Sequence, residues 1–191
     1  MFPVSIETER LLLREFLPRD LDRIHAYASD PEVVKFMIWG PNASLEETAD
    51  NLASRWSRAN ENPRLDYDLA IELKDEGMLV GAGGFRIRSE RSRSAELGYV
   101  LLRSRWGNGY MPEAMQAMFR FGFDDLALHR MWATTDVRNE RSRRVLEKLG
   151  MRREALLKQD ELRQGQWTDS YLYALLEEEW RAGLGRTHGD S

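Results

Sequence analysis

Residues 105–114 have the composition of a loop that binds an anion through its backbone. Gly107 and Gly109 let the main chain approach a ligand closely because glycine carries no Cβ atom. Pro112 follows, and its fixed φ suits the first turn of a helix. A helix that begins here leaves free N–H groups at its positive end, where phosphates bind. The pattern therefore indicates a phosphate-binding turn, and a plain turn into a helix is the alternative.

Several better-defined chemistries are missing from the chain. The loop lacks the Gly-Lys-Ser/Thr of a Walker motif and the third glycine of a dinucleotide fingerprint. Gly-x-Ser-x-Gly is absent and the histidines number only 3, which disfavours a serine hydrolase. The 0 cysteines exclude disulfides, thiolate metal sites and a cysteinyl intermediate. We therefore expect no metal, and we expect any group transfer to be direct.

The elements that must position this loop follow an α/β (α+β) pattern. Alternating apolar and polar residues predict a meander of antiparallel strands, and helical periodicity predicts helices on either side of it. Together they predict a mixed, largely antiparallel sheet of about seven strands flanked by helices. The expected strands are 11–14, 67–73, 78–87, 94–102, 131–135, a segment from 151 and 167–176, and the expected helices begin near 20, 30, 44, 112 and 140.

Two features of the expected meander carry a local prediction. Gly98 falls inside a strand, where a glycine indicates a bulge or a close backbone approach. The turn before this strand is rich in arginine, and a solvated hairpin tip is favoured there over an anion-binding patch. The arginines are Arg86, Arg88, Arg91 and Arg93.

Length and charge limit the remaining function classes. With 191 residues, the chain suits one domain, which we place at 1–183, followed by a flexible tail at 184–191. The net charge of −4 argues against general nucleic-acid binding and favours cationic partners, if any. No apolar run reaches the ~18 residues that cross a bilayer, so no membrane association is expected. The absence of cysteine fits the cytoplasm.

Two neighbouring segments carry a pattern that is known from one enzyme family. They read Glu-Leu-Gly-Tyr-Val-Leu at residues 96–101 and Trp-Gly-Asn-Gly-Tyr-Met-Pro-Glu-Ala at residues 106–114. This pattern resembles the acetyl-CoA signature of the GNAT (GCN5-related N-acetyltransferase) superfamily. Residues 8–14, 139–142, 147–151 and 165–175 are similar to its branch of ribosomal-protein alanine/serine N-terminal acetyltransferases. The resemblance implies an acetyl-CoA-dependent N-acetyltransferase with the fold of that family, and a homodimer by analogy.

The resemblance also implies where acetyl-CoA binds. The strand around Gly98 would splay from the strand 131–135, and the pantetheine arm would lie in the gap, bonded to the backbone of Val100, Leu101 and Leu102. The pyrophosphate would sit on the N–H groups of the loop, at Trp106, Gly107, Asn108, Gly109, Tyr110 and Met111. Met111 departs from the small residue that the family usually has at this position.

Candidate catalytic residues come from two sources. Spacing alone makes Asn139 a helix cap and leaves Ser142 in an exposed first turn. The resemblance implies instead that Asn139 contacts the cofactor and that Ser142 donates a proton to the departing thiolate. It also implies that Glu161, in Lys-Gln-Asp-Glu at 158–161, acts as the base, whereas other branches use a glutamate at the position of Glu96. Both carboxylates stay open as the base.

The amine acceptor is the least determined part of the prediction. A protein N-terminal α-amino group is the leading hypothesis because of the branch that the chain resembles. Aminoglycosides, polyamines and amino acids are alternatives within the same chemistry. An acyl-CoA-binding module without catalysis is the alternative from another class, and the presence of Ser142 with a candidate base argues against it.

Overall fold

The computed structural model describes residues 3–187, and side-chain burial up to residue 183. Eight strands form one sheet in the order β1-β2-β3-β4-β5-β6-β8-β7, and only the β5–β6 pair is parallel. The strands are β1 Ser5–Glu7, β2 Leu11–Arg14, β3 Asp66–Leu73, β4 Met78–Ser89, β5 Ser94–Leu101, β6 Arg130–Asp136, β7 Arg152–Arg163 and β8 Gln166–Leu176. The α-helices are α1 Leu21–Ala28, α2 Pro31–Val34, α3 Leu45–Ala59, α4 Tyr110–Arg120, α5 Glu140–Lys148 and α6 Glu177–Thr187.

The mixed, largely antiparallel sheet confirms the predicted fold class, with three differences in detail. The sheet has one strand more than expected, because β1 is only 3 residues long and too short to show a periodicity. Gly98 lies in regular register opposite Gly84, so the expected bulge is wrong there; open space surrounds the position where a Cβ would be. Helix α6 takes in residues 184–187 of the expected tail, and 188–191 lie outside the described residues.

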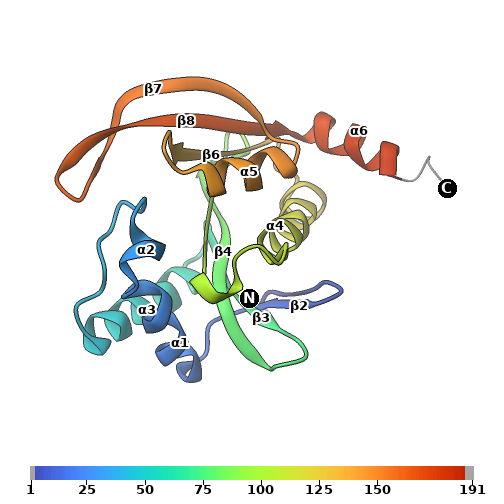
Figure 1. Cartoon of the computed structure of the whole chain (residues 1–191). Coiled ribbons are helices and arrows are strands. Elements are labelled where there is room, and N and C mark those ends of the chain that lie inside the picture. The colour runs from blue at the N-terminus through green and yellow to red at the C-terminus, as the bar shows by residue number, and fades with distance from the viewer. Residues whose placement is uncertain (1–2, 188–191) are drawn as a thin grey trace.

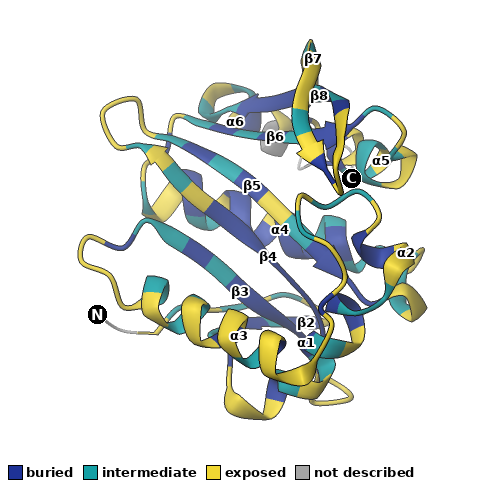
Figure 2. Cartoon of the chain, turned by 90° about the vertical axis from the view of Figure 1, so that its left-hand side faces the viewer, coloured by how far each residue is buried: buried dark blue, intermediate teal, exposed yellow. Residues whose placement is uncertain are grey.

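Helices cover both faces of the sheet (Figure 1, Figure 2). Helices α1, α2 and α3 pack on one face through Ile24, Tyr27, Val33 and Leu52. Helices α4 and α5 pack on the other, with Met115, Met118, Phe119 and Leu146 fully buried. Burial on both sides explains why the middle of β3 and β4 is almost continuously buried. Among the described residues, no helix is long and apolar enough to cross a membrane.

The sheet opens at its only parallel pair. The β5–β6 ladder consists of Ser94↔Arg130, Ala95↔Met131 and Glu96↔Trp132, and no further pair follows although both strands continue. Beyond this point β5 stays paired with β4, and β6 stays paired with β8. The two halves of the sheet therefore diverge after Glu96, which confirms the predicted splayed strand pair.

A buried ion-pair network joins β2 to β3, which lie on the other side of β4 from this opening. The guanidinium of Arg14 on β2 donates to both carboxylate oxygens of Asp20, at 2.7 and 2.9 Å. Its Nε donates to Glu72 on β3 at 2.8 Å. All three residues are at most 9% exposed. Because both carboxylates are buried, Asp20 depends on Arg14 for its ionic partner, and Glu72 depends on it for the closer of its two arginine contacts.

Replacing Arg14 should therefore unfold the protein more easily. We expect Arg14→Met to lower the free energy of unfolding by about 3–5 kcal/mol, because two buried carboxylates lose their partner. Arg19→Gln is the matched control. Arg19 also contacts Glu72, but at 3.3 Å and with a 64% exposed side chain, so it should cost less than about 1 kcal/mol. Urea denaturation measures both, and equal effects would contradict the assignment.

Candidate active site

The edge of β5 that faces the opening carries unpaired backbone groups. The N–H of Leu102 donates to Val80 on β4 at 2.9 Å. Because N–H and C=O groups alternate in direction along a strand, those of Leu101 and Tyr99 point toward the opening. The carbonyl of Leu101 accepts a hydrogen bond from the indole of Trp106 at 2.9 Å. Of the predicted residues 100–102, Leu101 is therefore the one whose backbone faces the gap, while Val100 and Leu102 face β4.

The glycine loop meets helix α4 just below this edge. Gly107 and Gly109 have φ of +83° and +79°, a backbone region that other residues enter only at a cost. Gly109 is the N-cap of α4 and no side chain caps this end of the helix. The N–H groups of the first turn thus stay free to bind an anion, except at Pro112, which has none. Met111 is buried in the core, so its side chain points away from this anion site.

The N-terminal segment clamps the loop from outside. Glu113 in the first turn of α4 accepts hydrogen bonds from the hydroxyl of Thr8 at 2.6 Å and from Nε of Arg10 at 2.7 Å. Arg10 also donates to the carbonyl of Asn108 at 3.1 Å and lies over the ring of Tyr110. Burial alone raises the pKa of the Glu113 carboxyl, but the bonds from Thr8 and Arg10 outweigh it and leave the pKa below its ordinary value.

Side chains of the loop also join it to the neighbouring elements. The amide of Asn108 donates to the carbonyls of Arg105 and Trp106, which fixes the turn. The guanidinium of Arg141 on α5 lies 4.5 Å from the centre of the Trp106 ring. Helix α5 therefore lies next to the glycine loop, on the side of the opening where β6 ends.

The first turn of α5 holds Ser142 against Tyr99. The side chain of Asn139 caps the helix by accepting from the N–H of Ser142 at 3.1 Å, so its capping role is real. The hydroxyl of Ser142 lies 3.0 Å from the hydroxyl of Tyr99 on β5, and this contact bridges the opening. Burial raises the pKa of Tyr99 and the bond from Ser142 lowers it less, so the phenol stays protonated and can donate.

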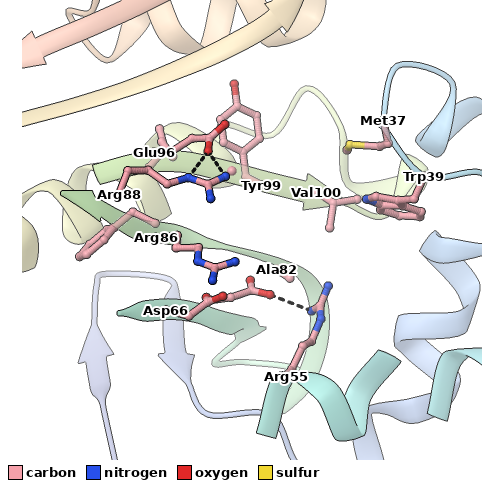
Figure 3. A pocket seen from close by; sticks show the side chains of 15 residues that line it. Met37, Trp39, Arg55, Asp66, Ala82, Arg86, Arg88, Glu96, Tyr99 and Val100 are labelled. Atoms are coloured by element: carbon pink, nitrogen blue, oxygen red, sulfur yellow. Dashed lines mark hydrogen bonds and ion pairs between the residues drawn. The ribbon is translucent and has the colours of Figure 1, made fainter. Parts of the chain in front are cut away.

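A pocket of about 290 Å³ lies on the α1–α3 side of β3, β4 and β5 (Figure 3). Glu96 lines it, and its carboxylate accepts from Nε of Arg88 at 2.6 Å. Gly98 and Val100 lie on the same face of β5 as Glu96, since side chains alternate along a strand. Met37 and Trp39, from the loop after α2, form the apolar end of the pocket in Figure 3. Trp39 also packs against the core beneath α1 and α3, so it anchors its loop as well.

Glu161 stands apart from this pocket. It lies on β7 opposite Thr168, in the β7–β8 hairpin, and is not among the residues that line the pocket. A bulge at residues 158–160 precedes it, where Gln159 has a φ of +48° and its N–H donates to Asp169 at 3.0 Å. Nearby, buried Arg163 donates to the carbonyl of Phe36 at 3.1 Å and so fastens the hairpin to the loop after α2.

The structure thus brings together some of the predicted residues and separates others. Glu96 lies in the pocket, and Ser142 lies across the opening from it, in contact with Tyr99. The role of Tyr99 was missed by sequence reasoning, although its position in Glu-Leu-Gly-Tyr was visible. Arg10 and Glu113 were missed as a clamp because they are distant in sequence. Among residues 3–187, no group of acidic and histidine side chains is placed to hold a metal ion.

Several known proteins are similar to this chain in sequence over most of its length. It is 35% identical to YnaD of Bacillus subtilis, described as an uncharacterized N-acetyltransferase, over 93% of this chain and 99% of that protein. It is 32% identical to the ribosomal protein uS5 alanine N-acetyltransferase of Escherichia coli over 94% of both chains.

Solved structures have the same fold. A GNAT-family acetyltransferase from Bacillus anthracis matches with a TM-score of 0.82 and 35% identity, over 92% of this chain and 100% of that one. Spermidine N-acetyltransferase from Vibrio cholerae, solved with CoA and spermine, matches with a TM-score of 0.78 but only 20% identity, over 91% and 99% of the two chains. The family model of the acetyltransferase (GNAT) domain matches residues 10–152. The opened sheet, the glycine loop and these matches together show that the chain belongs to the GNAT family and is an acetyl-CoA-dependent N-acetyltransferase.

Proposed function

We propose that this enzyme acetylates the α-amino group at the N-terminus of a protein. The observation that carries the proposal is its 32% identity, over 94% of both chains, to an enzyme named for an alanine of a ribosomal protein. A ribosomal-protein-S5-alanine acetyltransferase from Vibrio fischeri supports it, with 25% identity and a TM-score of 0.75 over 93% of this chain and 98% of that one. The likeness to the spermidine enzyme extends to the fold alone, so a polyamine acceptor is less well supported.

The opening and the glycine loop fit acetyl-CoA as the bound substrate. Free N–H groups at the start of α4, with Gly107 and Gly109, suit its pyrophosphate. The outward-facing backbone groups of Tyr99 and the N–H of Leu101 suit its amide-containing arm, which takes the place of a missing strand, while the carbonyl of Leu101 is engaged by Trp106. Asn139 is engaged as a helix cap, so it contributes by holding Ser142 at the edge of the opening.

The reaction requires two proton movements around one bond exchange. The amine nitrogen forms a bond to the thioester carbon while the carbon–sulfur bond breaks. The amine proton passes to a base, and the sulfur takes up a proton. Ser142 is the proton donor on the α5 side, and the protonated phenol of Tyr99, 3.0 Å from its hydroxyl, orients and replenishes it.

Glu96 is the base that the geometry favours. Its carboxylate lines the pocket at the point where β5 and β6 part, next to the place where the thioester would lie. Glu161 lies in the hairpin outside the pocket lining. A base must reach the proton directly or through one water. An α-amino group, with a pKa near 8, also demands less of its base than a lysine does.

An acceptor panel tests the proposed function. We expect N-terminal peptides to release CoA thiol from acetyl-CoA, whereas polyamines and aminoglycosides do not. Ser142→Ala and Tyr99→Phe should each lower kcat by about 10- to 100-fold, because the departing sulfur loses its proton source. Affinity for acetyl-CoA, measured by calorimetry, should stay unchanged. Turnover of polyamines but not of peptides would overturn the proposal.

The choice between the carboxylates has its own test. Glu96→Gln should lower kcat/KM by about 100-fold or more near pH 7 and less at pH 9, where the amine loses its proton unaided. Glu161→Gln is the matched control and should stay within about threefold of the wild type. If Glu161→Gln lowers kcat/KM more than Glu96→Gln does, Glu161 and not Glu96 is the base.

Loss of the clamp should loosen the glycine loop. We expect Glu113→Gln to raise the Kd for acetyl-CoA about 5- to 20-fold with little change in kcat, because Arg10 loses a charged partner. The lowered pKa of Glu113 adds a stability that is fully present above the pKa of an unfolded glutamate. It disappears as the pH falls through the lower pKa of the folded state. Thermal melts of both proteins from pH 7 to pH 3 should therefore converge in acid; a constant offset would argue against the clamp.

A further inference from the structure

The pocket that holds Glu96 is lined by six charged side chains, three acidic and three basic. Asp66 and Asp68 come from β3, Arg86 and Arg88 from β4, and Glu96 from β5, while Arg55 reaches in from α3; together they are Arg55, Asp66, Asp68, Arg86, Arg88 and Glu96. Formal charge therefore cancels among the lining residues. The charge that the pocket presents to a ligand therefore depends on which of these side chains already have an ion-pair partner.

All three acidic groups have an arginine partner. Glu96 is bonded to Arg88. Asp68 lies 3.4 Å from Arg55; burial raises the pKa of Asp68 above its ordinary value, and the charge of Arg55 offsets part of this rise. Asp66 accepts from Nε of Arg58 at 2.9 Å, and Arg58 is not itself a lining residue. Since one of the three partners comes from outside, one lining arginine is left over.

That arginine is Arg86. Its side chain is exposed, and no hydrogen bond or ion pair joins it to another of the described residues, 3–187. It stands on β4 between two partners in the ladders, Asp66 on β3 and Glu96 on β5. Directly opposite residues of neighbouring strands have Cα atoms about 4.5–5.5 Å apart. In Figure 3 the guanidinium of Arg86 lies at the charged end of the pocket, on the β3 side of β4 and beside Asp66, while Arg88 and Glu96 lie on the β5 side.

We infer that Arg86 binds a carboxylate of the acceptor, so that the preferred acceptor is an N-terminus with an acidic side chain beside its α-amino group. This inference rests on the proposed function. An amine at Glu96 places the next few atoms of the acceptor within reach of Arg86, because the two residues face each other across β4 and β5. A guanidinium binds a carboxylate through two parallel hydrogen bonds and discriminates strongly against a cation.

The apolar end of the pocket determines the rest of the acceptor. Met37 and Trp39 lie at the opposite end from Arg88 and Arg86 in Figure 3. A small apolar first side chain fits between them and Val100, with the acidic group at the next position. The net charge of −4 favours cationic acceptors over the whole surface, but the unpaired cation in the pocket reverses this preference locally.

Three peptides that differ at one position test the inference. They begin Ala-Glu, Ala-Gln and Ala-Lys and are otherwise identical. The wild type should acetylate the Ala-Glu peptide with a kcat/KM about 10-fold or more above that of Ala-Gln, mainly through KM, and Ala-Lys should be poorest. Arg86→Gln should abolish the difference between the first two, because kcat/KM for Ala-Glu falls to the value for Ala-Gln. Arg86→Lys should restore part of it, because the charge returns without the paired donors.

Arg91→Gln is the matched control, since Arg91 is an exposed arginine in the turn of the same β4–β5 hairpin and lies outside the pocket lining. It should keep the full preference for Ala-Glu. Equal rates for the three peptides in the wild type, or an unchanged preference in Arg86→Gln, would overturn the inference and leave the proposed function standing. If no peptide reacts, the rates with free aspartate and glutamate are compared with the rates with asparagine and glutamine. This comparison tests the role of Arg86 separately from the peptide acceptor. A preference for the acids that Arg86→Gln removes would sink the peptide acceptor and keep the role of Arg86.

Discussion

The early end of the β5–β6 ladder is the constraint on which the rest of the structure depends. After Glu96↔Trp132 the two strands part, although both lie in the middle of a sheet that is covered on both faces. Unpaired backbone groups in such a place are costly. They persist because β4 holds one strand and β8 the other. The gap therefore offers unpaired backbone groups to a strand-like ligand, which is the role that we propose for the arm of acetyl-CoA.

The same opening distributes the chemistry over two faces of the sheet. Tyr99 and Glu96 are three residues apart on β5, so their side chains leave the strand on opposite sides. Tyr99 meets Ser142 on the α5 side, and Glu96 lines the pocket on the α1–α3 side. A thioester held in the gap would lie between a proton donor and a base.

Ion pairs determine the electrostatic character of the pocket that holds Glu96 more than the number of its charged residues does. Arginines neutralise Asp66, Asp68 and Glu96, so a pocket with three carboxylates is not an anionic pocket. The direction of its selectivity depends on which partner each charge has, and Arg86 is the group for which the described residues supply none. Contacts of this kind join residues that are distant in the chain, such as Arg55 and Asp68, or Arg10 and Glu113.

The sequence by itself determined the fold class and the glycine loop, because periodicity and turn chemistry are local, and it indicated the family through the resemblance of its motifs. It placed the start of α3 at Ser44 and the cap of α5 at Asn139 for the same reason. It could not show that Glu96 lines the pocket while Glu161 does not, find the contact between Tyr99 and Ser142, or tell which arginine is unpaired. Those depend on the divergence of β5 from β6, on the bulge before Glu161 and on the register of β3, β4 and β5. Only the tertiary structure decided them, because distances between side chains from different strands are fixed by packing and not by spacing along the chain.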